Sequence, residues 1–438
     1  MRHLYSALFL LLLPLIVLRM LWRSRRAPAY RQRLGERLGF LSLPDAGPEP
    51  APLLWIHAVS LGETIAAGPL IERLLQTRPG WRVLVTTTTP TGSAQLRKLF
   101  GERVLHVYAP WDTPGAVARF LRRVRPDLLV LMETELWPNM INGCRESGCA
   151  VVLANARLSE RSARGYARIA GLTGTILGGL DRVAAQAESD AQRFVDLGLD
   201  PQRVTVCGSI KFDVQLDADL RRNAALLRER WQLTDRPVCL VASTHRGEDP
   251  IALELLARLR QDHPRTVLIL APRHPERFDE VATLTTNAGY VLRRRSAGDE
   301  LEEASDVMLV DTLGELLQLF GVADLAVIGG SFIPNGGHNP LEAALWGIPV
   351  IAGPSMFNFA EVSAGLEAAG ALQRVADGEE LGAVAEALLA NPEDARRRGD
   401  AGLAVVQQNR GALSSILGIV EEEMVRAEAK RRAEQRAM

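Results

Sequence analysis

Short apolar runs alternate with helical patterns along most of the chain, after a loop rich in Pro, Gly and Asp at 42–52. Helical patterns such as those at 251–259 and 314–320 lie between the runs. The Val, Ile and Leu content of the runs predicts strands that are buried on both faces of a sheet. These predicted strands are 53–59, 83–87, 104–108, 128–132, 151–154, 183–186, 204–207, 238–242, 267–270, 291–294, 307–310, 325–328 and 350–352. Strand and helix repeating at this spacing predict an α/β fold with doubly wound parallel sheets.

The alternation of predicted strands and helices is interrupted at 208–236, where no strand is predicted and a helix-like stretch rich in Arg and Asp lies instead. We therefore expect two Rossmann-like domains, at 27–208 and 237–410, joined by a linker at 209–236. A membrane anchor is expected at 1–26 and a helix at 411–438, whose charged tail we interpret as solvated. Doubly wound sheets bind ligands beyond the carboxyl ends of their strands, so two such domains predict a cleft with one ligand on each side.

The N-terminal segment is predicted to attach the chain to a membrane. Residues 4–22 contain Arg19 as their only charge, which is at the short end for a spanning helix. Three arginines follow at 23–26 in place of a small-residue cleavage site, so we expect no removal as a signal peptide. These arginines and Trp22 favour a spanning helix with the body in the cytoplasm. Pro14 and Arg19 leave open a helix that lies in one leaflet.

The charge is unevenly distributed along the chain. Lys and Arg number 51 against 52 Asp and Glu, a formal net charge of −1, and hydrophobic residues make up 47% of this globular composition. Residues 1–37 contain eight arginines and one glutamate, so they carry +7 and the remainder carries −8. This balance argues against a nucleic-acid-binding protein and suits the surface of an anionic membrane. The four cysteines lack the number and spacing of a disulfide framework or a zinc site.

Carboxylates follow two predicted strands of the first half. Glu63 follows the first strand and is either a general base or a helix-start residue stabilised by the helix dipole; position alone favours the second interpretation. Glu133 directly follows the strand at 128–132 and is better placed than Glu135 to reach into a cleft. Lys211, near the domain joint, is either a surface lysine or a cation for an anionic substrate.

Basic and glycine-rich turns follow the strands of the second half. Arg273 lies between a strand and a predicted helix, an arrangement suited to phosphate. In the turn at 311–315, backbone N–H groups can cradle an anion or a base edge. The glycine loop at 329–339 leads to Pro340, which favours a helix whose first turn contains Glu342. Hydrogen bonds to ribose hydroxyls would explain that carboxylate.

These clusters are typical of a nucleotide-sugar transferase that needs no metal or cofactor. Arg273, Lys211 and helix N-termini would meet the charge of the leaving phosphate, and one carboxylate would deprotonate the acceptor hydroxyl. No G-x-G-x-x-G follows the first strand of either half and no P-loop is present, which disfavours a dinucleotide dehydrogenase and the commonest class of ATPase.

Five motifs in order resemble the 3-deoxy-D-manno-octulosonic acid (Kdo) transferase family of lipopolysaccharide assembly. They are WIHAVSLGE at 55–63, METELWPN at 132–139, GSIKFD at 208–213, PRHPER at 272–277 and GHNPLE at 337–342. The resemblance covers nearly the whole chain, including the anchor. It implies a GT-B glycosyltransferase fold at the cytoplasmic face of a bacterial inner membrane, with CMP-Kdo as the donor and the lipid A precursor lipid IVA as the acceptor.

The resemblance also implies roles for individual residues. Transfer would be inverting, with Glu63 as the general base, so the family reverses the preference given by position alone. Glu133 and Lys211 would stabilise the transition state. The residues implied to contact CMP, partly through their backbone, are Pro272, Arg273, Leu313, Gly314, Glu315, Asn339, Pro340, Leu341 and Glu342.

Two alternatives from other classes stay open at this point. A nucleotide-sugar epimerase of the same fold would share the glycine loop and Glu342 but would need no lipid-directed anchor. A non-catalytic membrane scaffold would bind the nucleotide without turnover.

Overall fold

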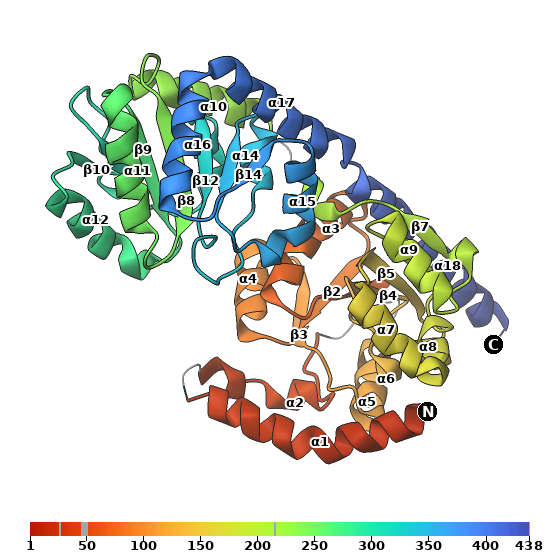
Figure 1. Cartoon of the computed structure of the whole chain (residues 1–438). Helices are drawn as coiled ribbons and strands as arrows, with labels where there is room; N and C mark the ends of the chain where they lie inside the picture. The colour runs from red at the N-terminus through yellow and green to blue at the C-terminus, as the bar shows by residue number, and fades with distance from the viewer. Residues whose placement is uncertain (26–27, 45–50, 214–215, 438) are drawn as a thin grey trace. The chain divides into compact units, whose positions relative to one another are not determined.

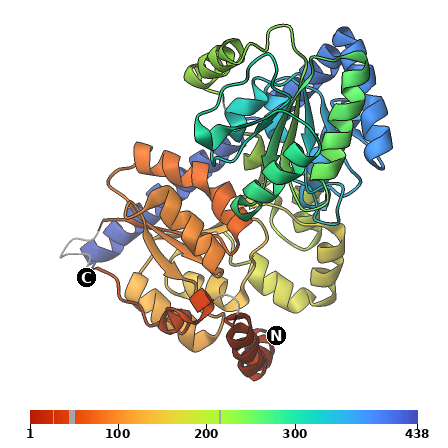
Figure 2. The same ribbon diagram turned by 90° about the vertical axis from the view of Figure 1, so that its left-hand side faces the viewer.

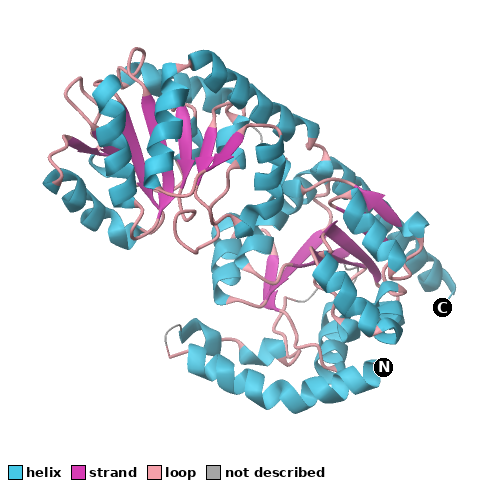
Figure 3. Cartoon of the chain, viewed as in Figure 1, coloured by secondary structure: helices cyan, strands magenta, loops and turns pink. Residues whose placement is uncertain are grey.

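The computed structural model describes residues 1–25, 28–44, 51–213 and 216–437, so Arg26 of the expected anchor and residues 45–50 of the predicted loop lie outside the described part. The chain forms two compact units, drawn with their sheets in magenta in Figure 3. Unit 1 comprises Met1–Asp213 and Arg410–Met438, and unit 2 comprises Val214–Asn409.

Unit 1 is built on a parallel seven-stranded sheet in the order β3-β2-β1-β4-β5-β6-β7, of which β2 to β5 and β7 are labelled in Figure 1. The strands are β1 Leu53–His57, β2 Arg82–Thr87, β3 Leu105–Tyr108, β4 Leu128–Met132, β5 Ala150–Ala156, β6 Arg182–Ala185 and β7 Val204–Val206. The helices are α1 Arg2–Arg23, α2 Leu34–Arg37, α3 Leu61–Thr77, α4 Pro90–Phe100, α5 Pro114–Val124, α6 Pro138–Glu146, α7 Glu160–Arg168, α8 Ala170–Leu177, α9 Glu188–Asp196 and α18 Ala412–Ala437. Three 3₁₀ turns are η1 Pro28–Arg31, η2 Pro201–Arg203 and η3 Ile210–Phe212.

Polar caps start the helices that follow β1, β2 and β3. The side chains of Ser60, Thr89 and Thr113 each accept a hydrogen bond from a backbone N–H of the first turn of α3, α4 and α5. In α4 and α5 a proline follows the threonine, where its fixed φ suits a helix and its missing N–H costs nothing. These caps fix where each helix begins and therefore where the loop from the preceding strand ends.

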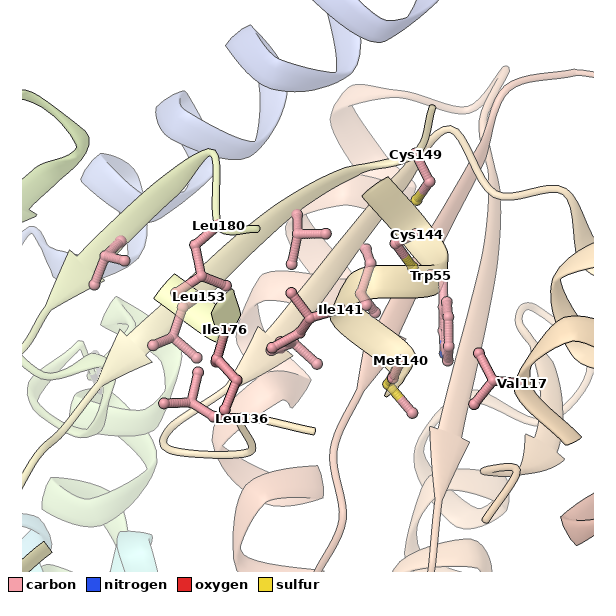
Figure 4. Packing of buried hydrophobic residues seen from close by; sticks show 14 of the residues in the cluster. Trp55, Val117, Leu136, Met140, Ile141, Cys144, Cys149, Leu153, Ile176 and Leu180 are labelled. Carbon is pink, nitrogen blue, oxygen red and sulfur yellow. The ribbon is translucent and has the colours of Figure 1, made fainter. Parts of the chain in front are cut away.

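Both faces of the unit 1 sheet are buried, because successive residues of each strand point to opposite sides. Trp55, Leu131 and Leu153 belong to the core on one face, shown in part in Figure 4, which α5, α6 and α8 cover. Leu54 and Val130 belong to the core on the other face, to which α3 and α18 contribute.

Unit 2 contains a second parallel seven-stranded sheet, in the order β10-β11-β9-β8-β12-β13-β14. Its strands are β8 Val238–Thr244, β9 Val267–Pro272, β10 Leu292–Arg294, β11 Val307–Leu309, β12 Leu325–Ile328, β13 Val350–Ala352 and β14 Leu372–Arg374. Its helices are α10 Ala218–Arg230, α11 Asp249–Asp262, α12 Phe278–Asn287, α13 Leu316–Phe320, α14 Leu341–Leu345, α15 Ala360–Ala368, α16 Gly378–Ala390 and α17 Pro392–Gln408, with 3₁₀ turns η4 Pro275–Arg277, η5 Arg295–Ala297 and η6 Phe357–Phe359.

The two predicted parallel sheets are confirmed, and each predicted strand has a counterpart within a few residues. The prediction omits β14 at the edge of the second sheet. Only Leu372 of its three residues is buried, so the segment lacks the continuous apolar run of a central strand.

The boundary between the units falls inside the region that we expected to be a linker, 209–236. Turn η3 at its start belongs to unit 1, whereas α10 belongs to unit 2. The C-terminal helix α18 belongs to unit 1, where Ile416, Val420 and Met424 are buried in the core. The first turns of the charged tail are therefore partly buried rather than fully solvated.

Helix α1 is long and apolar enough to cross a membrane, and it is the one helix of the described residues that meets this criterion. It could therefore anchor the chain in a membrane.

Candidate active site

The order of the strands in unit 1 identifies one position where a ligand is expected. The chain passes from β3 at one edge to β4 beside β1, so the direction of sheet growth reverses between β1 and β4. Open α/β sheets bind ligands in the crevice that such a reversal leaves at the carboxyl ends of the strands. Glu63 lies in the first turn of α3, after β1, and Glu133 directly follows β4.

The carboxylate of Glu63 is held at the start of α3 by two hydrogen bonds. Ser60 Oγ donates to Oε1 at 2.7 Å and the Val59 N–H donates to Oε2 at 2.8 Å. In return the Glu63 N–H donates to Ser60 Oγ at 3.3 Å. This arrangement resembles a capping box, except that the Glu63 carboxylate accepts from the Ser60 hydroxyl and the Val59 N–H rather than from the N–H of the N-cap Ser60, and it makes Glu63 a helix-start residue in this structure. The same hydrogen bonds fix its carboxylate beside the expected ligand crevice.

Glu63 is buried, with 7% of its surface exposed. Burial raises its pKa to about 7, although the hydrogen bonds from Ser60 and Val59 act in the opposite direction. The negative charges of Glu135 and Glu133 also raise this pKa. A carboxyl group that titrates near neutral pH suits a general base, because it is both available and able to accept a proton.

The loop after β4 is fixed by aromatic and hydrogen-bond contacts. Trp137 Nε1 donates to Glu135 Oε2 at 2.6 Å, and the ring of His57 meets the Trp137 ring edge-on at 4.9 Å between centroids. Burial raises the pKa of Glu135, which this hydrogen bond offsets in part. Glu135 is therefore committed to Trp137, and Glu133 is left as the second candidate of the loop.

Glu133 and Asn155 both adopt left-handed backbone conformations, with φ of 56° and 52°. They follow paired residues of neighbouring strands, since Met132 of β4 pairs with Ala154 of β5. Non-glycine residues in this region are uncommon and collect at functional sites, because the surrounding structure must hold them there.

Asn155 also positions the turn that contains Lys211. Its Oδ1 accepts a hydrogen bond from the Ile210 N–H at 3.1 Å, at the start of η3. Asp213, at the end of the same turn, accepts from the backbone N–H groups of Gly411 and Leu413. Unit 1 thus contains all three predicted catalytic residues, and it brings Glu63 and Glu133 within electrostatic range of each other.

The predicted CMP-binding residues all lie in unit 2, at or after the carboxyl ends of β9, β11 and β12. Pro272 ends β9 and Arg273 follows it; residues 313–315 lie between β11 and α13; residues 339–342 lie between β12 and α14. Strands β11, β9, β8 and β12 are consecutive neighbours, so these three segments lie at the same edge of one parallel sheet.

The two arginines of the motif PRHPER, at the end of β9, differ in their surroundings. Arg277 is buried and its guanidinium pairs with Asp249 and donates to the Thr244 carbonyl. Arg273 is exposed. Arg273 is therefore the arginine of this motif that is available to a phosphate group.

An ion pair that the sequence did not predict joins Arg295 of η5 to Glu315 in the turn after β11. Arg295 donates to both carboxylate oxygens of Glu315, at 3.1 and 2.8 Å, and this contact is the main cause of the lowered pKa of Glu315. Gly314 has a φ of +93°, and Leu313 is 65% exposed. Because its carboxylate is paired with Arg295, Glu315 can contact a ligand through its backbone.

Glu248 holds the glycine-rich loop after β12 in place. Its Oε2 accepts from the N–H groups of His245 and Gly330, at 2.8 and 2.7 Å, and its Oε1 accepts from Phe332 N–H at 3.0 Å. The loop leads to Asn339, whose side chain accepts from the Leu341 N–H and donates to Glu342. Burial raises the pKa of Glu342.

A group of imidazoles lies beside this loop. His245 Nε2 and His338 Nε2 are 2.9 Å apart in parallel rings, and the His274 ring lies 5.1 Å from that of His245. Burial and the neighbouring cations lower the pKa of His338 to about 4, so it is neutral at pH 7. Within the described parts of the chain, no group of three or more His, Cys, Asp or Glu side chains is placed to hold a metal ion.

Several residues that position these sites were not singled out in the sequence, among them Ser60, Asn155, His245 and Glu248. Residues 243–248 read STHRGE after a strand, the same pattern of polar residues and glycine that drew attention to Glu63. Applied to the first strand of the second half, that signal would have identified His245 and Glu248. Nothing in the sequence singles out Asn155, whose partner Ile210 is distant along the chain.

Comparisons with known proteins show which family the chain is similar to. A family model described as 3-deoxy-D-manno-octulosonic-acid transferase (kdotransferase) matches residues 32–214. The 3-deoxy-D-manno-octulosonic acid transferase of Haemophilus influenzae is 40% identical over 421 residues, which cover 96% of this chain and 98% of the relative. That of Bordetella pertussis is also 40% identical, covering 96% of this chain and 99% of the relative.

The fold resembles that of a nucleotide-sugar enzyme of known structure. The crystal structure of UDP-GlcNAc 2-epimerase from Neisseria meningitidis matches with a TM-score of 0.55 at 14% identity, covering 86% of this chain and all of the epimerase. At this identity the likeness concerns the fold alone, which is the GT-B type with two Rossmann-like units. The near full-length identity to named transferases decides the activity: the chain belongs to the 3-deoxy-D-manno-octulosonic acid transferase family, glycosyltransferases of lipopolysaccharide biosynthesis.

Proposed function

We propose that the chain transfers Kdo from CMP-Kdo to lipid IVA with inversion, without a metal ion, at the cytoplasmic face of the bacterial inner membrane. In this reaction the acceptor hydroxyl oxygen attacks the anomeric carbon of Kdo as the bond from that carbon to the CMP phosphate breaks. The hydroxyl proton passes to Glu63, and CMP leaves with the bonding electrons. The α1 helix and the basic segment that follows it suit an acceptor that is an anionic lipid.

The observation that carries the proposal is the environment of Glu63. Its carboxylate is positioned by Ser60 and Val59 at the strand-order reversal between β1 and β4, and its pKa is about 7. Glu133 and Lys211 of the same unit are proposed to stabilise the charge that develops in the transition state.

The donor would be bound by unit 2. We propose that Arg273 pairs with the CMP phosphate, and that the backbone of Pro272, Leu313, Gly314 and Glu315 contacts the nucleotide. The remaining contacts would come from Asn339, Pro340, Leu341 and Glu342. The exposed guanidinium of Arg273 supports the first assignment.

Replacing the base tests the chemical step. Glu63→Gln is expected to lower turnover by about 10² to 10⁴, because an amide cannot accept the proton of the lipid hydroxyl. CMP affinity should change little. Turnover is measured on the purified full chain with CMP-Kdo and lipid IVA, and the glycolipid product is identified by mass. Glu72→Gln, in the same helix but at an exposed ion pair with Arg103, is the matched control. Near-normal turnover of Glu63→Gln would remove it from this role.

Replacing the phosphate-binding arginine tests the donor site. Arg273→Ala is expected to weaken CMP binding about ten-fold or more, through loss of a charge-assisted contact. Calorimetric titration with CMP measures the effect. Arg246→Ala removes an exposed arginine that pairs with Glu280 and is the control. Equal CMP affinities for the two variants would contradict the assignment.

A further inference from the structure

Helix α1 has two different faces along its length. At about 100° per residue, Ser6, Met20 and the C-cap Ser24 share one face, and they are exposed by 6%, 9% and 3%. The opposite face holds an outer stripe of large apolar side chains, each between 54% and 75% exposed. The outer stripe consists of Leu4, Leu8, Leu11, Leu15, Leu18 and Trp22.

The inner face is attached to α6 of unit 1 at its N-terminal end. Ser6 Oγ donates to Asn139 Oδ1 at 3.0 Å, and Arg2 pairs with Glu146 at 3.2 Å. Tyr5 packs against the core that α5 and α6 cover. At the other end, Arg31 donates to Ser24 Oγ at 2.6 Å. Figures 1 and 2 show α1 lying along the outside of unit 1.

These contacts bear on how α1 meets a membrane. The helix is about 33 Å long, close to the ~30 Å thickness of the hydrocarbon core, so its length permits a span. A spanning α1 would, however, place Arg2 at the far surface of the bilayer and Ser6 within the far leaflet, both away from the body of the protein. Neither residue could then contact α6, which belongs to that body.

We propose that α1 lies in the plane of the membrane on the cytoplasmic leaflet, with its outer stripe in the lipid and its inner face on unit 1. The occupant of the outer stripe is thus an anionic phospholipid leaflet. Arg19, Arg23 and Arg25 are exposed and match the phosphates of its headgroups. The inference rests on the membrane location in the proposed function, and is independent of the catalytic residues assigned there.

The side of the membrane on which residue 3 lies distinguishes the two arrangements. His3→Cys in the full chain is treated with a membrane-impermeant maleimide in intact spheroplasts and after lysis. An in-plane helix leaves His3→Cys unlabelled in spheroplasts and labelled after lysis. Labelling in intact spheroplasts would show that α1 spans and would overturn the proposal. Arg25→Cys lies on the cytoplasmic side in both arrangements and is the matched control; the unaltered chain gives the background of the native cysteines.

A second experiment tests the occupant of the outer stripe. Leu8→Glu with Leu15→Glu is expected to lower binding to phosphatidylethanolamine/phosphatidylglycerol vesicles at least ten-fold in flotation. The control places the same charges on Leu226 and Leu284 of unit 2, at 55% and 36% exposure. Unchanged binding would overturn the proposal, as would efficient disulfide-linked dimerisation of Leu11→Cys, which would assign the outer stripe to a second copy. Transferase activity of the unaltered chain is measured separately, so failure of the proposed function is distinguished from failure of this inference.

Discussion

At the scale of single residues, Glu63 combines a structural role with a chemical one. Ser60 caps α3 and also donates to the Glu63 carboxylate, which stabilises its charged form against the effect of burial. The raised pKa means that the folded state binds this proton more tightly than the unfolded state. The resulting contribution to stability is present below the ordinary pKa of 4.5 and is lost as pH rises through about 7. Stability thus favours the protonated carboxyl of Glu63, whereas a general base must be the carboxylate, which predominates above pH 7.

If Glu63 is the base, kcat/KM should increase as pH rises, with an apparent pKa near 7 that reports deprotonation of Glu63. Ser60→Ala removes the hydrogen bond that favours the carboxylate, so this limb is expected to move to higher pH by up to about one unit. Thr89→Ala removes an equivalent cap from α4, with a similar stability cost of about 1 kcal/mol, and should leave the limb in place. Equal pH profiles for the two variants would show that Ser60 acts on the helix alone.

Site residues that directly follow a strand can be predicted from the sequence. Site residues that hydrogen-bond to a distant segment of the chain are much harder to predict. Glu133 and Arg273 are found because they come directly after apolar runs. Asn155 and Glu248 act by accepting backbone N–H groups of segments distant along the chain. The local sequence around Asn155 or Glu248 does not indicate which backbone N–H group will lie beside its side chain in the folded protein. The roles of the predicted residues rest on the family resemblance and stay predictions.

At the scale of elements, apolar runs identify central strands because both faces of a parallel sheet are covered. The edge strand β14 escapes this criterion, since a strand buried on one side or less lacks a continuous run. Close approach between elements is equally invisible in the sequence. Gly399 of α17 and Gly365 of α15 look alike there, but the first faces the backbone of Gly347 and the second faces open space.

The two glycines provide a matched prediction of packing. A Cβ at Gly399 would collide with the Gly347 carbonyl, which cannot move as a side-chain end can, so Gly399→Ala is expected to destabilise unit 2 by about 1–3 kcal/mol or more. A Cβ at Gly365 meets no described atom within 4 Å, so Gly365→Ala should stabilise by up to about 1 kcal/mol. Thermal unfolding of both variants measures the difference, and shifts of the same sign would contradict this packing.

At the scale of the whole molecule, the last helix completes the first unit. The helical pattern at 411–438 is readable in the sequence, but its packing partner is not, because the contacts that define it come from β4, β5 and α3. Met424 is fully buried in that core, whereas the adjacent Val425 is 54% exposed.

Met424→Ala is expected to lower the free energy of unfolding of unit 1 by about 2–5 kcal/mol, through lost apolar burial and the cavity that it leaves. Val425→Ala should change it by less than about 0.5 kcal/mol. Denaturant titration followed by Trp fluorescence measures both. Similar effects of the two substitutions would mean that α18 does not occupy this core in solution.

The return of α18 to unit 1 has a consequence for synthesis of the chain. On the ribosome, residues 214–409 can emerge and fold as a continuous piece, whereas the half made first waits for Ile416, Val420 and Met424 before its interior is closed. Nascent unit 1 therefore displays an apolar surface for as long as translation of unit 2 lasts. Chaperone binding to nascent unit 1 should therefore persist until α18 has left the exit tunnel.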